Sequence, residues 1–257
     1  MKREHQKIVA VGLYDFQMAQ IVDRSGVDIV SVGDSVGPNM WGLDSEHDVT
    51  LDQMVLACTA VRRGVTRALV SCDFPGRVLD EGVDIVIRAA RRLVDEGGTD
   101  VVKVDGLADS PDVVQALTDA GVRVWAQLGA AVRLKANPMN DVQLKPDTTT
   151  DPDVERWVVA AKRLESAGAV MLNFTHSGPI AGPAVVQAVS IPVLGGLGGG
   201  PWLDGRIRVV GNAIGYLARA LDDDVERYAN VARIALDAIA AYADDVRSGR
   251  QVKGEPA

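Results

Sequence analysis

The sequence has few of the residues that build metal clusters and disulfide frameworks. It contains three histidines and two cysteines in 257 residues. Cys58 and Cys72 lack the spacing of a zinc motif, and a single pair of thiols does not make a disulfide scaffold. We therefore expect neither a structural zinc site nor a disulfide framework, and we place both cysteines in the apolar core.

Basic residues are also scarce, with 27 Lys and Arg against 35 Asp and Glu and a net charge of −8. This balance argues against a nucleic-acid partner, which requires a basic face to neutralise phosphates. No apolar run approaches the roughly 20 residues that span a bilayer. Asp15 interrupts the apolar run near the N-terminus, so we expect no signal peptide. We predict a cytoplasmic protein that binds neither membrane nor nucleic acid.

Short apolar runs alternate with longer amphipathic segments along the whole chain. The runs are rich in Val, Ile and Leu without strict polar alternation, which is typical of parallel strands covered on both faces. They lie at 7–13, 27–34, 67–73, 100–106, 122–129, 169–175 and 191–198, with a weaker eighth at 207–215. Helices are expected at 16–26, 51–64, 82–98, 111–121 and 151–168.

This pattern predicts an α/β fold, a (β/α)8 TIM barrel in one domain over residues 1–257, because about 32 residues per unit suits a barrel of typical size. A doubly wound open sheet is the alternative. However, no GxGxxG motif follows the first strand, and the glycines at 196–200 come too late for a dinucleotide site.

Two segments interrupt the alternation. Residues 130–150 form a long polar connection after the fifth strand, which is either an active-site loop at the C-terminal rim or a plain surface loop. Residues 216–247 read as one or two extra helices, within a C-terminal extension over about 216–250. An apolar helix outside the barrel often packs against another subunit, so we expect a homo-oligomer.

Three carboxylates end three consecutive predicted strands: Asp34, Asp73 and Asp105. Chemistry in barrels lies at the C-terminal rim, where neighbouring strands are about 4.8 Å apart. The three side chains are therefore expected to converge on Mg²⁺ or another divalent cation. The alternative is that each aspartate only caps the helix or turn that follows it.

Lys103 lies two residues before Asp105, so both side chains point to the same side of the strand. A lysine that points into a barrel either binds a carboxylate or enolate of the substrate, or forms a structural ion pair with Asp73 or Asp105. Gln127 lies in the fifth strand and Asn173 in the sixth, and His176 follows just beyond.

These residues resemble those of a known family. The segments 13–64, VSCDFP, VVKVDG, LESAGAVMLNF and AIAAYADDVRSGR are similar to ketopantoate hydroxymethyltransferase (3-methyl-2-oxobutanoate hydroxymethyltransferase). The resemblance covers nearly the whole chain and implies the barrel of the phosphoenolpyruvate mutase and isocitrate lyase superfamily. It implies a small 2-oxo acid substrate, Mg²⁺, 5,10-methylenetetrahydrofolate as co-substrate, a decamer and a place in pantothenate biosynthesis.

The resemblance also implies roles for individual residues. Asp34 and Asp73 match the metal-site aspartates, which also hold the substrate, and Ser35 and Lys103 match residues that bind the 2-oxo acid. Asp105 stands where the family has glutamate, so its contact with the metal is expected to run through water.

Two positions mark the chain as a divergent member of the family. Gln127 replaces a histidine, and Asn173 replaces the glutamate proposed as general base. Neither Gln nor Asn takes up a proton at neutral pH. His176 is therefore the candidate replacement base, or else a plain loop histidine. Asn173 could instead donate a hydrogen bond to an enolate or oxyanion.

Three functions follow from these residues. The first is a Mg²⁺-dependent enzyme that makes or breaks a C–C bond of a 2-oxo acid, as hydroxymethyl transfer does. The second is a lyase or hydrolase that acts on an oxo- or hydroxy-(di)acid without removing a C–H proton. The third is a non-catalytic barrel that binds a ligand or acts as a scaffold.

Overall fold

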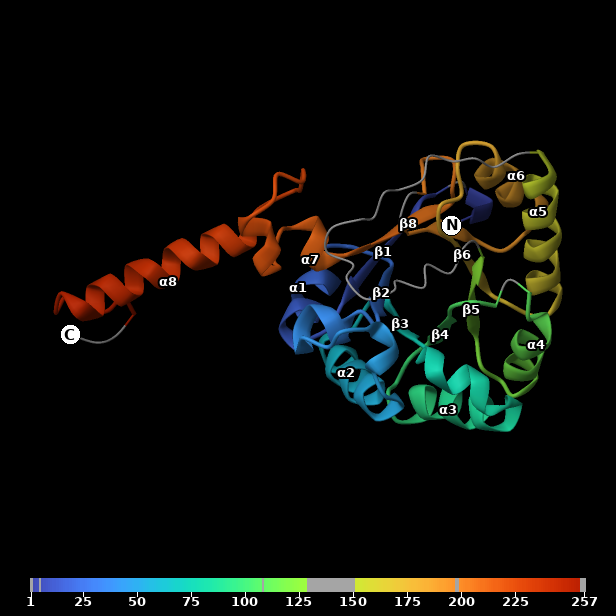
Figure 1. Cartoon of the computed structure of the whole chain (residues 1–257), viewed down its shortest axis with the longest axis horizontal. Helices are drawn as coiled ribbons and strands as arrows, with labels where there is room; N and C mark the ends of the chain where they lie inside the picture. Colours follow the sequence, from blue (N-terminus) through green and yellow to red (C-terminus); the bar gives the residue numbers. More distant parts are fainter. Residues whose placement is uncertain (1, 5, 108, 129–150, 197–198, 255–257) are drawn as a thin grey trace. The chain divides into compact units, whose positions relative to one another are not determined.

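The computed structural model describes residues 2–4, 6–107, 109–128, 151–196 and 199–254. Within these residues, eight parallel strands close into a barrel in chain order (Figure 1). The strands are β1 (Ile8–Leu13), β2 (Ile29–Val32), β3 (Leu69–Asp73), β4 (Val101–Val104), β5 (Val124–Leu128), β6 (Met171–Phe174), β7 (Val193–Gly195) and β8 (Gly205–Val209). The predicted (β/α)8 fold is confirmed.

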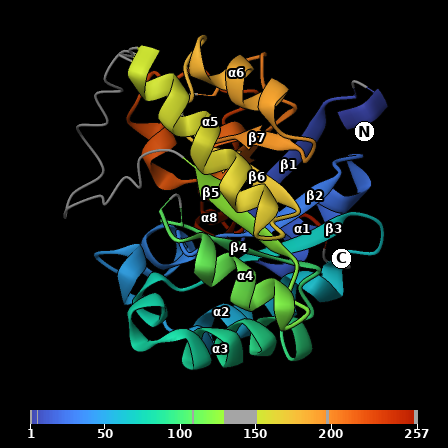
Figure 2. The same cartoon turned by 90° about the vertical axis from the view of Figure 1, so that its right-hand side faces the viewer.

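Helices connect the strands and surround them on the outside (Figures 1 and 2). They are α1 (Phe16–Arg24), α2 (Leu51–Gly64), α3 (Val83–Asp95), α4 (Pro111–Asp119), α5 (Asp151–Ser166) and α6 (Ala181–Ala188). Side chains that cap the first turn determine where two of these helices begin. Asp15 accepts the Met18 N–H at the start of α1, and Thr50 and Gln53 form a capping box at the start of α2.

The structure corrects two details of the predicted elements. The last strand begins at Gly205, before the predicted 207–215 run, and residues Val210–Ala213 form the short helix α7 instead of strand. Helix α6 was not predicted. Its eight residues include Pro183 and carry almost no polar residue, so they offer little of the polar and apolar alternation by which a helix is recognised.

Apolar side chains fill the N-terminal half of the barrel interior. Residues from six strands form one buried cluster: Ile8, Ala10, Ile29, Val101, Trp125, Met171 and Leu194. Side chains alternate between the two faces of a strand, so the residues two positions further along also point inward. This places Lys103, Gln127 and Asn173 above the apolar cluster, towards the C-terminal rim.

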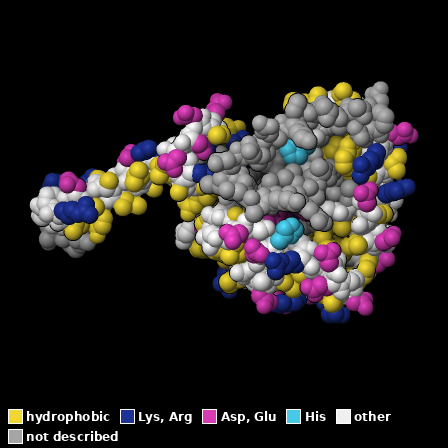
Figure 3. All heavy atoms as spheres, in the orientation of Figure 1, with side chains coloured by type: hydrophobic (Ala, Val, Ile, Leu, Met, Phe, Trp, Pro, Cys, Tyr) yellow, Lys and Arg dark blue, Asp and Glu magenta, His cyan; other side chains and the backbone are white. Residues whose placement is uncertain are grey.

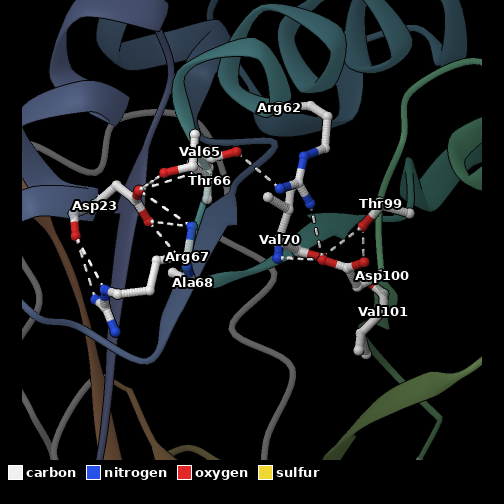
Figure 4. Close-up of polar contacts among 10 residues, drawn as sticks. All are labelled: Asp23, Arg62, Val65, Thr66, Arg67, Ala68, Val70, Thr99, Asp100 and Val101. Carbon is white, nitrogen blue, oxygen red and sulfur yellow. Dashed lines mark hydrogen bonds and ion pairs between the residues drawn. The ribbon is translucent and has the colours of Figure 1, made fainter.

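Aspartates tie the strands together at the opposite, N-terminal end of the barrel (Figure 4). Asp100, just before β4, accepts the Val70 N–H of β3 at 2.8 Å and pairs with Arg62 at 3.0 Å. Asp28 and Asp204, which precede β2 and β8, accept the N–H groups of Val9 and Val193 in the same way. Aspartates therefore link three pairs of neighbouring strands at the N-terminal end of the barrel, opposite the polar rim.

Residues Val209–Ala257 form a second compact unit. It contains α7, the 3₁₀ turn η5 (Ala218–Leu221) and the helix α8 (Val231–Arg247). The predicted extra helices at 216–247 are therefore reduced to a short turn and one helix that begins at Val231. Hydrophobic side chains lie exposed along α8 (Figure 3), among them Ile234, Ile239 and Tyr242. No described helix is long and apolar enough to cross a bilayer.

Candidate functional site

Ionisable and amide side chains line the C-terminal half of the barrel interior. Asp73, Lys103, Gln127 and Asn173 are each less than 9% exposed, although all four are polar. They come from the ends of β3, β4, β5 and β6. Strand register sets Asp73 opposite Lys103 and Gln127 opposite Asn173. Buried polar groups that no structural requirement explains point to a ligand site at this rim.

A chain of contacts runs across three strands. The Lys103 ammonium lies 3.2 Å from Asp73 Oδ2 and 2.8 Å from Asp105 Oδ1. Gln127 Nε2 donates to Asp105 Oδ2 at 2.9 Å when the amide nitrogen faces that carboxylate. The ion pairs between Lys103 and both aspartates, one of the two expected arrangements, are therefore present. They leave room for a substrate oxygen on the ammonium, which has three donors.

Burial and the neighbouring charges shift the pKa values of Lys103 and Asp73. Burial works against the charged form of Lys103, but the carboxylates of Asp105 and Asp73 outweigh it and raise the pKa of the lysine. Burial raises the pKa of Asp73 to about 6, against the lowering effect of Lys103 and of a hydrogen bond from the Asp34 N–H. Lys103 is therefore a permanent cation in this site.

Asp34 and Ser35 follow β2 directly. Burial and the charges of Asp73, Asp105 and Glu46 raise the pKa of Asp34 well above its ordinary value. A side chain on the preceding residue, Gly33, would place its Cβ 2.9 Å from Ser35 Oγ. A side chain at position 33 would displace the serine hydroxyl from its present position, so glycine leaves room for it.

A tyrosine that sequence reasoning missed holds Ser35 in place. Tyr14 Oη lies 2.9 Å from Ser35 Oγ, and Asn39 Nδ2 donates to Tyr14 Oη at 3.0 Å. Either hydroxyl can donate in the pair of Tyr14 and Ser35, and when Tyr14 donates, the serine hydroxyl proton is left for a ligand. No polar spacing in the sequence links residue 14 with residue 35, so only the fold reveals this network.

The residues at the rim fit a divalent cation held by two carboxylates. Asp73 Oδ1 is buried and has no hydrogen-bond partner among the described residues, and Asp34 is its neighbour on β2. No group of three or more His, Cys, Asp or Glu side chains within the described chain could hold an ion. Mg²⁺ commonly takes one or two carboxylates and completes its shell with water and substrate. Asp105 is engaged by Lys103 and Gln127. This arrangement therefore does not favour Asp105 as a direct third ligand of the cation.

Asn173 lies on β6, on the side of the barrel away from Asp34. Its Oδ1 atom is buried and has no hydrogen-bond partner in the described part of the chain. A Cβ placed on Gly196, at the end of β7, would lie 3.8 Å from that oxygen. The amide therefore faces the barrel mouth with an unused acceptor, available to a ligand.

His176 lies just beyond β6, half-buried, with a backbone φ of 51°. Its role as a replacement base stays a prediction. The connection at 130–150, expected as an active-site loop or a plain surface loop, lies outside the described residues.

Sequence reasoning also missed Glu46, a half-buried residue in the loop between β2 and α2. Burial raises the pKa of this carboxyl, and the charge of Asp105 raises it further, while Lys103 and His47 lower it. Glu46 therefore lies within electrostatic reach of the groups at the end of β4. The sequence carried no signal for it, because a loop carboxylate has no periodic position.

Cys58 and Cys72 are both free and fully buried, which confirms their placement in the core. Cys72 points away from the barrel interior, because it alternates with the inward-facing Asp73.

Several solved structures share this fold. A phosphonopyruvate hydrolase, crystallised with oxalate and Mg²⁺, aligns with a TM-score of 0.61 at 12% identity, over 96% of this chain and 85% of that one. A 2,3-dimethylmalate lyase of the PEP mutase/isocitrate lyase superfamily aligns with a TM-score of 0.59 at 14% identity, over 99% and 88%. At these identities the likeness establishes the shared fold.

Sequence relatives are closer. The 3-methyl-2-oxobutanoate hydroxymethyltransferase of Geobacillus kaustophilus is 33% identical over 250 residues, covering 96% of this chain and 87% of the relative. The enzyme of the same name from Prosthecochloris aestuarii is 32% identical over 253 residues, covering 97% and 90%. The sequence model of ketopantoate hydroxymethyltransferase matches residues 1–251. The chain belongs to the ketopantoate hydroxymethyltransferase family, a family of transferases.

Proposed function

We propose that this protein is a Mg²⁺-dependent enzyme that transfers a hydroxymethyl group to 3-methyl-2-oxobutanoate. The observation that carries this proposal is the group at the barrel mouth: an unpartnered carboxylate oxygen on Asp73, Asp34 beside it, and the buried cation Lys103. A 2-oxo acid offers the matching chemistry, since its carboxylate and ketone oxygens chelate a cation and accept from an ammonium. The specific substrate, 3-methyl-2-oxobutanoate, is inferred from the names of the relatives described above.

Asp34 and Asp73 would hold the cation. When bound, it supplies Lewis-acid polarisation of the ketone. Lys103 donates to an oxygen of the 2-oxo acid and balances negative charge that develops there. Ser35, oriented by Tyr14, donates to the substrate carboxylate. Asp105 and Gln127 hold the ammonium in place from the side of β5.

The one-carbon donor in this proposal is 5,10-methylenetetrahydrofolate, by analogy with the family. Asn173, on the far side of the mouth, presents an unused acceptor that suits a hydroxyl or N–H of the second reactant. The Gln127 amide donates to Asp105, which in turn pairs with Lys103. We therefore assign Gln127 the role of positioning the lysine.

We also propose a homo-oligomer, with a decamer as the form expected by analogy with the family. The support is the exposed apolar side chains of α8, such as Ile234, Ile239 and Tyr242, which a second subunit would bury. Light scattering coupled to size exclusion gives the mass directly, and a monomeric mass would contradict this part of the proposal.

A lyase or hydrolase is the second candidate, and Asn173 is the observation that favours it. An amide at this position cannot take up a proton, whereas it can hydrogen-bond an enolate or oxyanion that forms by bond cleavage. The candidates differ in one step. Hydroxymethyl transfer requires removal of the C3 proton, and cleavage of an oxo- or hydroxy-acid does not.

Deuterium exchange separates the two candidates. The purified protein is incubated with 3-methyl-2-oxobutanoate and Mg²⁺ in D₂O, and the C3 proton is followed by NMR. The proposal predicts exchange that depends on both protein and Mg²⁺. An exchange rate equal to that of the buffer would reject the proposed function.

A further inference from the structure

The loop between β2 and α2 presents a carboxylate that the mechanism above does not use. Glu46 opens the 3₁₀ turn η3 (Glu46–Asp48), where the Ser45 side chain accepts the His47 N–H. Glu46 is half-buried, whereas His47 and Asp48 on the same turn are exposed. Within the described chain, no hydrogen bond or ion pair engages the Glu46 carboxylate. It is thus a free acceptor in a partly desolvated place.

Contacts on both sides fix the orientation of this turn. Asp48 pairs with Arg77 at 2.6 Å, on the 3₁₀ turn η4 (Gly76–Glu81) that follows β3. His47 lies against Gly76 of η4, where an added Cβ would be 3.3 Å from its Nδ1. These contacts direct residues 47 and 48 towards η4, which leaves Glu46 on the remaining side of the turn.

The loop that carries Glu46 follows β2, and in a (β/α)8 barrel the loops that follow the strands lie at the C-terminal rim. Its contacts with η4, which follows β3, place the turn at the β2–β3 side of that rim. The electrostatic influence of Lys103 and Asp105 on Glu46, and of Glu46 on Asp34, agrees with this position. This is the place where a 2-oxo acid held by Lys103 and the aspartates would lie.

The other carboxylates at the barrel mouth already have a partner or an assigned role. Asp73 and Asp105 are paired with Lys103, and Asp34 is assigned to the cation. Gln127 and Asn173 cannot accept a proton at neutral pH. Burial and Asp105 raise the pKa of Glu46 above that of a free glutamate, which brings it closer to the range of an effective general base.

We propose that Glu46 is the catalytic residue that removes the C3 proton of the 2-oxo acid, a role that rests on the proposed function. The C3–H bond breaks and its electron pair forms the C2–C3 double bond. The carbonyl π pair moves to the C2 oxygen beside Lys103, and the proton goes to a carboxylate oxygen of Glu46. In D₂O the reverse step returns a deuteron to C3.

The test measures C3 exchange of 3-methyl-2-oxobutanoate in D₂O with Mg²⁺, for the wild-type protein and four variants. Glu46→Gln keeps the shape and removes the base. Glu46→Asp keeps the base but withdraws it by one methylene. Asp44→Asn, at an exposed carboxylate on the same loop, is the matched control, and His176→Gln tests the histidine. Circular dichroism and calorimetric titration of the 2-oxo acid report folding and binding separately from turnover.

Loss of a positioned base is expected to slow exchange by about 10²–10⁴-fold in Glu46→Gln, with substrate affinity within about threefold of wild type. Glu46→Asp should exchange at a rate between those of Glu46→Gln and the wild type, Asp44→Asn should exchange like the wild type, and His176→Gln should lose far less than Glu46→Gln. Near-wild-type exchange in Glu46→Gln, or a loss confined to His176→Gln, would overturn the assignment. If loss of exchange in Glu46→Gln were matched by equal loss of substrate binding, Glu46 would be a binding residue and the assignment would also fall. Absence of exchange in the wild-type protein would instead reject the proposed function, and the role of Glu46 with it.

Discussion

Asp23 offers the clearest test of how the barrel is held together away from the site. Its carboxylate is 6% exposed and lies at the end of α1, beside the residues that lead into β3 (Figure 4). It accepts the Thr66 N–H at 3.0 Å, the Thr66 hydroxyl at 2.9 Å and the Ala68 N–H at 2.9 Å. These hydrogen bonds from Ala68 and Thr66 lower the pKa of Asp23 from 3.8 to about 2, against the effect of burial.

The loss in Asp23→Asn can be calculated from these contacts. A shift of the pKa from 3.8 to about 2 corresponds to roughly 2 kcal/mol of stability at pH 7. The substituted amide also turns an NH₂ group towards main-chain N–H donors and leaves at least one of them unsatisfied, which costs about 1–3 kcal/mol. We expect a total loss of about 3–5 kcal/mol in the free energy of unfolding.

The pH dependence has a definite sign. The folded pKa lies below the unfolded one, so the contribution of Asp23 is fully present above about pH 4 and is lost as the pH falls through about 2. The difference between the wild type and Asp23→Asn should therefore narrow as the pH is lowered through this window. Turnover should be unchanged, because about 16 Å of extended strand separates Ala68 from Asp73.

Urea unfolding followed by circular dichroism, at pH 7 and at steps down to pH 2.5, measures these differences. Asp52→Asn is the control, because the Asp52 side chain is 81% exposed and its surface pair with Arg92 should contribute less than about 1 kcal/mol. A loss at pH 7 in Asp23→Asn no larger than in Asp52→Asn would refute the reasoning, as would a difference that does not narrow in acid.

Two further predictions concern the site. Mg²⁺ at about 100 times its Kd should add roughly 2.7 kcal/mol to the stability of the wild type. Asp73→Asn should lose most of that gain because it removes one anionic ligand; equal thermal shifts with Mg²⁺ would contradict this assignment. Gln127→Leu deprives Asp105 of its amide partner and should raise KM for the 2-oxo acid about tenfold, whereas Gln127→His should stay within about threefold. Steady-state kinetics measures both, and an unchanged KM in Gln127→Leu would show that the amide does not position Lys103.

The strands and most of the rim residues could be predicted from the sequence. Parallel strands are covered on both faces, so each appears as an apolar run, and the residue that ends each run lies at the rim. Asp34 and Asp73 were located by that rule, and Lys103 by its place two residues before Asp105, on the same side of the strand. The boundary between β8 and α7 was missed because residues 209–215 contain no proline and no charged residue that would mark where the strand ends.

Other parts of the site depend on geometry that no local pattern carries. The bond between Gln127 and Asp105 follows from the register of β4 and β5, and Tyr14 reaches Ser35 only because β1 and β2 are neighbours. Glu46 belongs to a rim loop whose neighbours Asp48 and His47 are held against η4, a contact between segments that no local pattern predicts. The expected convergence of three aspartates on one cation was too simple, since the sequence does not show that Lys103 and Gln127 engage Asp105.

Transfer of a labelled carbon tests the proposed reaction most directly. The protein is supplied with 3-methyl-2-oxobutanoate, Mg²⁺ and 5,10-methylenetetrahydrofolate carrying ¹³C at the methylene carbon, and the products are read by NMR. Hydroxymethyl transfer predicts a labelled CH₂OH group attached to C3 of the 2-oxo acid, formed only when both reactants and the cation are present. If label never enters the 2-oxo acid, while the same preparation cleaves an oxo- or hydroxy-diacid, the protein is a lyase or hydrolase and not a hydroxymethyltransferase.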